Sequence, residues 1–305
     1  MRSLILTSSL VLLFGILFGF STASIAGVVA PIAEAFSLST RATEMVVTAL
    51  LVGCFFGAAA AAPVSESIGR RPTCLVAAGL AIAGYALVPL GQEVAPGPGM
   101  LVAARLLIGF GVGLSSMAVP MYAAEATPAR HRGAVVSLFQ LAVTIGILIG
   151  YAVPLALLGV ASWQAMLGGG ILIPILCALP ALLLPESPRW LKARGAGPEA
   201  EAAARRLGIL AELGEEPEEA RGDWRAVLGM GSTKAVLALC SMLFILQNFS
   251  GIDGILYYAP HIFTELGFPE GTAALAATFG LGLMNVLATV AALLQIGRAS
   301  CRERV

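Results

Sequence analysis

Long apolar runs alternate with short polar connections along most of this chain. A run of about twenty apolar residues can cross the hydrocarbon core of a bilayer as an α-helix, because a helix satisfies all of its own backbone polar groups. The pattern predicts an all-α fold, a polytopic membrane helix bundle. Eight spans are expected: Leu4–Val29, Met45–Ala62, Thr73–Leu90, Met100–Tyr122, Ala134–Leu158, Trp163–Leu184, Ala235–Ala259 and Thr272–Leu294.

Composition supports a membrane protein and excludes an ordinary soluble domain. Hydrophobic residues make up 58% of the chain and charged residues 12%, with a mean hydropathy of +0.90. Soluble domains carry about a quarter charged residues. The formal net charge is zero and no basic patch with interleaved aromatic residues occurs, so no nucleic-acid partner is expected. The partners implied are the lipid bilayer and a small solute.

Basic residues favour one set of connections. Arg70 and Arg71 follow the second predicted span, and Arg130 and Arg132 follow the fourth, whereas the connections on the opposite side carry Arg41 as their one arginine or lysine. Basic residues near membrane spans concentrate on the cytoplasmic side. We therefore expect a cytoplasmic N-terminus, in either the plasma membrane or an organelle membrane.

The chain divides into four predicted parts. Residues 1–184 contain six spans, which is the size of a half-transporter built from two three-helix repeats. Residues 185–233 are hydrophilic and are expected to form a cytoplasmic loop with short helices. Residues 234–294 hold spans seven and eight, the start of a second half. Residues 295–305 are rich in arginine and differ in composition from the sequence before them, and we interpret them as a non-native tail.

Charged motifs gather at the predicted cytoplasmic ends of the spans. Glu125 lies near the membrane edge, where an unpaired charge costs about 3 kcal/mol, so a basic partner is expected; Arg130 and Arg132 are the nearest in sequence. These charges together predict a cytoplasmic gate that parts when the pore faces inward. Its expected residues are Arg70, Arg71, Glu125, Arg132, Glu186 and Arg189.

A string of glycines lies inside the fourth span, at Gly109, Gly111 and Gly113. The spacing is similar to that of a nucleotide-binding loop, but no strand precedes it and the residues lie in the middle of a span. Close packing of helices is therefore the favoured interpretation.

Three motifs together resemble one family. They are Gly69-Arg70-Arg71, then Pro120-x-Tyr122-x-x-Glu125-x-x-Pro128-x-x-x-Arg132-Gly133, and then Pro185-Glu186-Ser187-Pro188-Arg189. In this order they resemble the sugar-porter branch of the major facilitator superfamily, over spans one to eight. The resemblance implies twelve helices in two halves, alternating access, and transport of a monosaccharide (a hexose or a pentose). It implies neither an enzyme nor a cofactor.

On this basis the chain contains the first six-helix half and two helices of the second. We expect it to be truncated at its C-terminus and, because four helices are lacking, not to transport alone.

Amide side chains in mid-span are few, and they are candidates for binding sugar hydroxyls because an amide both donates and accepts hydrogen bonds. One buried amide can instead simply join two helices; four on three spans favour a ligand site. The seventh span reads Gln247-Asn248-x-x-Gly251-Ile-Asp253-Gly254, which resembles the family's Gln-Gln-x-x-Gly-Ile-Asn. Gly251 and Gly254 weaken the helix, so a break is expected there. The predicted substrate residues are Gln140, Gln247, Asn248, Asp253, Tyr257, Tyr258 and Asn285.

Two departures from the family pattern concern proton coupling. Ser21 occupies the place of the aspartate of proton symporters, while Arg105, the usual partner of that aspartate, remains. This favours passive uniport. Against it, Asp253 replaces an asparagine, and a carboxyl in a low-dielectric site can hold a proton. The alternatives are therefore proton-coupled sugar symport through Asp253, or a carrier for another polar organic solute.

Other classes have little support. An intramembrane protease would need a base for Ser115 or Ser116, and no predicted span supplies a suitably placed histidine or lysine. The cysteines and the two histidines lack the spacing of metal ligands, so no metal site is expected. A non-transporting sugar sensor with the same fold remains open.

Overall fold

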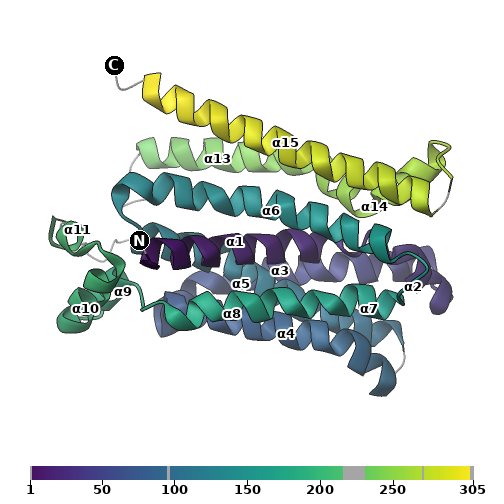
Figure 1. Ribbon diagram of the computed structural model, residues 1–305, viewed down its shortest axis with the longest axis horizontal. Coiled ribbons are helices and arrows are strands. Elements are labelled where there is room, and N and C mark those ends of the chain that lie inside the picture. Colours follow the sequence, from purple (N-terminus) through teal and green to yellow (C-terminus); the bar gives the residue numbers. More distant parts are fainter. Residues whose placement is uncertain (1, 95–96, 216–230, 270, 303–305) are drawn as a thin grey trace.

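The structure, a computed structural model, describes residues 2–94, 97–215, 231–269 and 271–302. The described part is an all-α bundle of long helices that run side by side, with short helices at its ends (Figure 1). Its elements are α1 (Arg2–Ala23), α2 (Val29–Ala35), α3 (Thr40–Ile68), α4 (Arg70–Val94), α5 (Pro98–Ala126), α6 (Ala129–Leu157), α7 (Trp163–Gly168), the 3-10 turn η1 (Gly169–Ile171), α8 (Leu172–Leu183), α9 (Pro188–Ala193), α10 (Gly197–Leu207), α11 (Leu210–Glu215), α13 (Gly231–Phe249), α14 (Ile252–Glu265) and α15 (Thr272–Arg302).

Within the described residues, eight helical segments are long and apolar enough to cross a membrane. They are Ser3–Ala23, Thr40–Ile68, Arg70–Gly91, Pro98–Ala126, Ala129–Leu157, Trp163–Leu183, Thr233–Glu265 and Thr272–Gln295. Each overlaps one predicted span, so the all-α fold and its eight spans are confirmed.

Three differences from the expected spans concern the end of the first span, the end of the eighth and the break in the seventh. The first span was expected to reach Val29, but α1 ends at Ala23 and a turn leads into α2. Gly27 in this turn lies so close to Pro154 that an added Cβ would be 2.4 Å from the proline ring. The last helix, α15, continues to Arg302 and so enters the predicted tail. The seventh span is broken between α13 and α14, at Gly251 but not at Gly254.

The first six spans form a closely packed unit in which α3 and α4 pack against α5, and α1 packs against α6. The glycines of α5 are the reason for the close approach. A Cβ added to Gly109 would lie 2.1 Å from the carbonyl oxygen of Leu50, and one added to Gly113 would lie 2.2 Å from that of Cys54. The prediction that this glycine string packs helices is confirmed.

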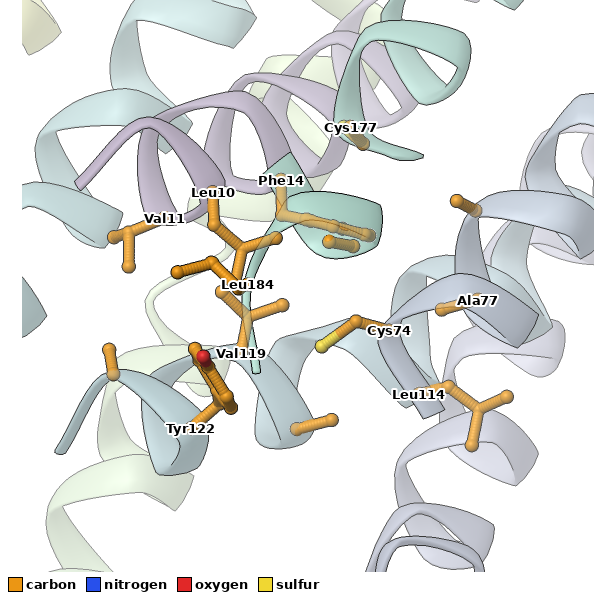
Figure 2. Packing of buried hydrophobic residues seen from close by; sticks show 14 of the residues in the cluster. Leu10, Val11, Phe14, Cys74, Ala77, Leu114, Val119, Tyr122, Cys177 and Leu184 are labelled. Carbon is orange, nitrogen blue, oxygen red and sulfur yellow. The ribbon is translucent and has the colours of Figure 1, made fainter. Parts of the chain in front are cut away.

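The main hydrophobic cluster joins α1, α4, α5 and α8 (Figure 2). Leu10 and Phe14 of α1 point toward Cys74 of α4, Val119 of α5 and the chain end of α8 at Leu184. Each of these side chains is at most 3% exposed. Because packing is tight here, the first half has a rigid core on which polar side chains at either end can be held in place.

The two ends of the bundle are formed by different elements. Helices α9, α10 and α11 and the N-terminus lie at one end, which we call the linker end; α2, α7 and the turn between α14 and α15 lie at the other, which we call the α2 end (Figure 1). Within the predicted loop and the predicted tail, residues 216–230 and 303–305 lie outside the described residues.

Candidate functional site: a charged cluster and a broken span

At the linker end, Arg70 at the start of α4 forms an ion pair with Glu125 near the end of α5. The Nε of Arg70 donates to Glu125 Oε2 at 3.1 Å and its Nη2 donates to Oε1 at 3.2 Å, so the pair is bidentate. Arg70 also donates to the carbonyl of Ser65. The side chains are 14% and 13% exposed. The structure thus gives Glu125 a partner from α4, rather than Arg130 or Arg132.

Glu186 caps the N-terminus of α4. Its carboxylate accepts hydrogen bonds from the backbone N–H groups of Arg70 (3.0 Å), Arg71 (3.1 Å) and Ser187 (2.7 Å). Gly69 makes this approach possible, because its φ of +102° is unfavourable for other residues and an added Cβ would lie 2.2 Å from the Glu186 carboxylate. Burial raises the pKa of Glu186, and the backbone N–H groups partly offset that effect.

Further contacts tie the start of the linker to the spans. Ser187 donates its hydroxyl to Glu125, and Tyr122 donates to the carbonyl of Pro185 at 2.9 Å. Arg71 bonds the carbonyls of Ala181 and Leu182 at the end of α8. Sequence reasoning missed Ser187 and Tyr122 as members of the cluster, although both lie inside motifs that it singled out.

The other two predicted gate residues lie beside this cluster. Arg132 pairs with Glu212 of α11 at 3.7 Å, and the same carboxylate accepts from the backbone N–H of Ala129 at 3.1 Å, at the N-terminus of α6. Arg189 lies in the first turn of α9 and is partly exposed. The structure therefore brings Arg70, Arg71, Glu125 and Glu186 together and places Arg132 with α11.

The break in the seventh span is formed at Ser250 and Gly251. Gly251 has a φ of +75°, in the left-handed region that favours glycine, whereas Gly254 lies inside α14. Among the predicted substrate residues, Gln247 and Asn248 form the end of α13, and Asp253 lies in the first turn of α14. All three are exposed, and Asn248 donates its amide to the carbonyl of Phe244 at 2.8 Å.

Gln140 lies on the face of α6 that meets the second half. Residues 140, 144, 147 and 151 follow helical spacing and share one face. Ile147 and Tyr151 on that face form a small buried cluster with Leu256 of α14. Gln140 is exposed and lies about 16 Å from Tyr151 along the helix axis, at 1.5 Å per residue.

Asn285 lies on the facing side of α15. A Cβ added to Gly282, three residues earlier, would be 2.9 Å from the Tyr151 ring, so this face of α15 packs against α6. Asn285 itself is partly buried. The helix directions are opposed, since α15 returns toward the linker end (Figure 1). Asn285 and Gln140 are thus on facing sides of neighbouring helices, both displaced from Tyr151 toward the linker end.

The two predicted tyrosines line a pocket of about 690 Å³ at the α2 end. Tyr257 is buried and Tyr258 is partly buried. The pocket also has polar walls from Glu34, Thr40, Thr43, Glu44, His261 and Thr264. The other five predicted substrate residues do not line it. The α2-end pocket is thus separate from the amides.

Arg105 of α5 is 1% exposed and lies inside the first half. It donates to the carbonyl of Val47 at 3.5 Å, while its Nε has no hydrogen-bond partner within the described part of the chain. Ser21 occupies the position at which the resemblance places the aspartate of proton symporters. Its hydroxyl shares a hydrogen bond of 2.8 Å with that of Tyr85 and donates to the carbonyl of Leu17 at 2.6 Å. Tyr85 also lies near Arg105.

No group of three or more histidine, cysteine, aspartate or glutamate side chains in the described residues is placed to hold a metal ion.

Known proteins similar to this chain are sugar transporters. The family model described as "Sugar (and other) transporter" matches residues 7–304. A galactose-proton symporter of Escherichia coli is 34% identical, over 92% of this chain and 61% of the relative. A D-xylose transporter of Levilactobacillus brevis is 35% identical, over 91% and 62%. The chain thus spans about three fifths of the length of these relatives.

Solved structures agree with this result. The partially occluded, inward-open conformation of the xylose transporter XylE from E. coli has a TM-score of 0.81 and 30% identity, over 96% of this chain and 73% of XylE. XylE bound to 6-bromo-6-deoxy-D-glucose, a proton:xylose symporter of the major facilitator superfamily, has a TM-score of 0.79. This chain is a multi-pass membrane protein that belongs to the sugar transporter family and has the major facilitator fold.

Proposed function

We propose that this chain forms the first six-helix half and two helices of the second half of a transporter for a monosaccharide, a hexose or a pentose, that works by alternating access. The observation that carries the proposal is the face of α6 that meets α14 and α15, because Gln140 shares this face with Tyr151, which contacts both helices, and α14 directly follows the break at Gly251. The amides of Gln140, Gln247, Asn248 and Asn285 would bind sugar hydroxyls, with Asp253 as a further acceptor. The sugars named for the relatives support this substrate class.

Tyr257 and Tyr258 would cover the sugar from the α2 end. They lie on α14, the part of the seventh span beyond the break, so bending at Gly251 would move both tyrosines as one unit. The pocket that they line would then be the outer entrance to the site.

The linker end would face the cytoplasm. Arg70, Arg71 and Arg132 lie at that end, together with α9, α10 and α11, whereas Glu34 and Glu44 line the pocket at the other. This distribution agrees with the excess of basic residues on cytoplasmic loops. The cluster of Arg70, Glu125 and Glu186 would then form the cytoplasmic gate, with Arg132 and Arg189 on its rim.

Transport would be passive uniport. A proton carrier next to Arg105 would have to be an acid, and Ser21 at that place is a hydroxyl that is already bonded to Tyr85 and Leu17. The second candidate is proton symport through Asp253; the similar galactose-proton symporter and the proton:xylose symporter XylE favour it. Asp253 is exposed at the start of α14, where a proton could reach it.

Replacing Gln140 with leucine should raise the KM for the transported monosaccharide about tenfold, because one lost hydrogen bond to the sugar is worth roughly 1.4 kcal/mol. Uptake of labelled hexoses, pentoses and polyols into proteoliposomes, with the complete protein that contains this chain, measures it. Gln164→Leu in α7 is the matched control and should leave KM unchanged. Uptake of a polyol or another organic solute, with no sugar transported, would contradict the proposal.

A uniporter should equilibrate its sugar but never accumulate it, because no second gradient drives the cycle. With an acidic medium outside and a neutral interior, the internal sugar concentration should level off at the external one. Asp253→Asn should leave this plateau unchanged. Accumulation above the external concentration that Asp253→Asn abolishes would establish the symport alternative instead.

Replacing Arg70 with alanine should destabilise the protein by about 3 kcal/mol, because it leaves the mostly buried carboxylate of Glu125 without its charged partner. The shift of the thermal unfolding midpoint in detergent measures this effect. Arg205→Ala is the matched control: Arg205 pairs with Glu201 at 3.6 Å, but both side chains are more than half exposed. The control should change stability by less than about 0.5 kcal/mol, and equal losses in both variants would refute a structural role for the buried pair.

A further inference from the structure

One hydrogen bond joins the two halves of the molecule in a buried place. The hydroxyl of Tyr151 in α6 donates to the backbone carbonyl of Leu256 in α14 at 2.7 Å. Tyr151 is 2% exposed and Leu256 is 6% exposed, so water does not compete for either group. The two residues are 105 positions apart in the sequence, and they belong to α6, the fifth span, and to α14, the outer part of the broken seventh span.

The carbonyl of Leu256 has no hydrogen-bond donor within its own helix because Pro260 lies four residues later. In an α-helix the carbonyl of one residue accepts from the N–H of the residue four positions later. Pro260 stands at that position inside α14 and has no N–H to donate. A buried carbonyl without a partner is unfavourable, and more so in a membrane protein. Tyr151 therefore supplies, from the other half, the hydrogen bond that α14 cannot make for itself.

The contact is held in place on all sides. Tyr151 and Leu256 form a buried cluster with Ala23 at the end of α1, Ala26 in the turn that follows it and Ile147 of α6. On its other flank the Tyr151 ring lies against Gly282 of α15, where an added Cβ would be only 2.9 Å away. The phenol is thus packed between α14 and α15.

This cluster lies between the α2-end pocket and the proposed sugar site. Ala26 of the cluster lines the pocket, as does Tyr257, the neighbour of Leu256. Gln140 precedes Tyr151 by eleven residues on α6 and so lies about 16 Å from it along the helix axis, toward the linker end. A sugar that enters from the pocket must therefore pass the place where Tyr151 holds α14.

We propose that the hydrogen bond from Tyr151 to the Leu256 carbonyl is the latch of the outer gate, and that it must break each time the transporter opens outward. This inference rests on the proposed function and its orientation. Outward movement of α14 would expose both groups to water, so the bond favours the closed state by the net value of one hydrogen bond, roughly fivefold in the closed-to-open ratio.

Tyr151→Phe tests the latch, because it removes the hydroxyl and keeps the ring that fills the space beside Gly282. The readout is the rate at which a cysteine introduced at Ala23, which is 1% exposed, reacts with a membrane-impermeant maleimide added outside. Mass spectrometry of the peptide that contains position 23 separates this reaction from labelling of the native cysteines. We expect labelling to become about fivefold faster.

Thr278→Val is the matched control. The buried Thr278 hydroxyl also donates to a backbone carbonyl, that of Ala274 at 2.8 Å, but both residues belong to α15, so this bond does not join two elements. Its loss should leave labelling at position 23 unchanged. An equal acceleration in both variants would show a general loosening and overturn the latch.

Pro260→Ala weakens the same Tyr151–Leu256 hydrogen bond by supplying a competing donor in α14. Alanine restores an N–H that can occupy the Leu256 carbonyl within α14, so labelling should again become faster. Because both changes act on one hydrogen bond, the double variant should label no faster than the quicker single variant. Wild-type labelling rates in Tyr151→Phe and Pro260→Ala, or fully multiplicative effects in the double variant, would overturn the proposal.

Sugar uptake distinguishes a failed latch from a failed function. Normal monosaccharide uptake by the wild type, with labelling that does not respond to Tyr151→Phe, overturns the latch alone. Faster labelling in the Tyr151→Phe variant supports the latch. If the wild type then takes up no sugar, the latch stands and the proposed monosaccharide substrate is overturned.

Discussion

The structure depends on one constraint: inside a bilayer every backbone N–H and carbonyl must find a partner within the protein. A continuous helix meets it through its own backbone hydrogen bonds, and the first six spans are helices that pack closely at their glycines. Where a helix starts or carries a proline, a backbone group loses its partner within the helix, and a side chain of another element can supply the missing bond. Some of these places are also ones that we assign to gating.

Three places in the described residues illustrate this. Glu186 accepts from the N–H groups that begin α4, and Glu212 accepts from the N–H that begins α6. Tyr151 donates to the carbonyl that Pro260 leaves free in α14. In each case the side chain comes from a different element, so satisfying a helix also fixes the position of one segment against another. A conformational change that separates the segments must give up that bond.

The apolar spans could be predicted because their length and composition follow directly from the thickness of the membrane. The end of α1 was predicted wrongly, at Val29, because the turn that follows Ala23 is itself apolar and hydropathy cannot distinguish it from a helix. The break at Gly251 was predicted correctly, since glycine next to a family motif is a local signal, whereas Gly254 is helical.

Contacts between distant elements were harder to predict. Glu125 clearly needed a cation, but its neighbours in sequence pointed to Arg130 and Arg132, while the structure supplies Arg70 from α4. Pro260 marks the free carbonyl of Leu256 in the sequence, yet nothing local identifies Tyr151 as its donor. Side chains of this kind become visible only when the packing of α6 against α14 and α15 is known.

The central claim is that the polar side chains of α6, α13 and α15 share one sugar site between the two halves. An experimental structure of the complete protein with a bound monosaccharide tests this most directly. The account predicts sugar hydroxyls within hydrogen-bond distance of Gln140, of Gln247 or Asn248, and of Asn285. A sugar bound elsewhere, with Gln140 directed toward lipid, would contradict it.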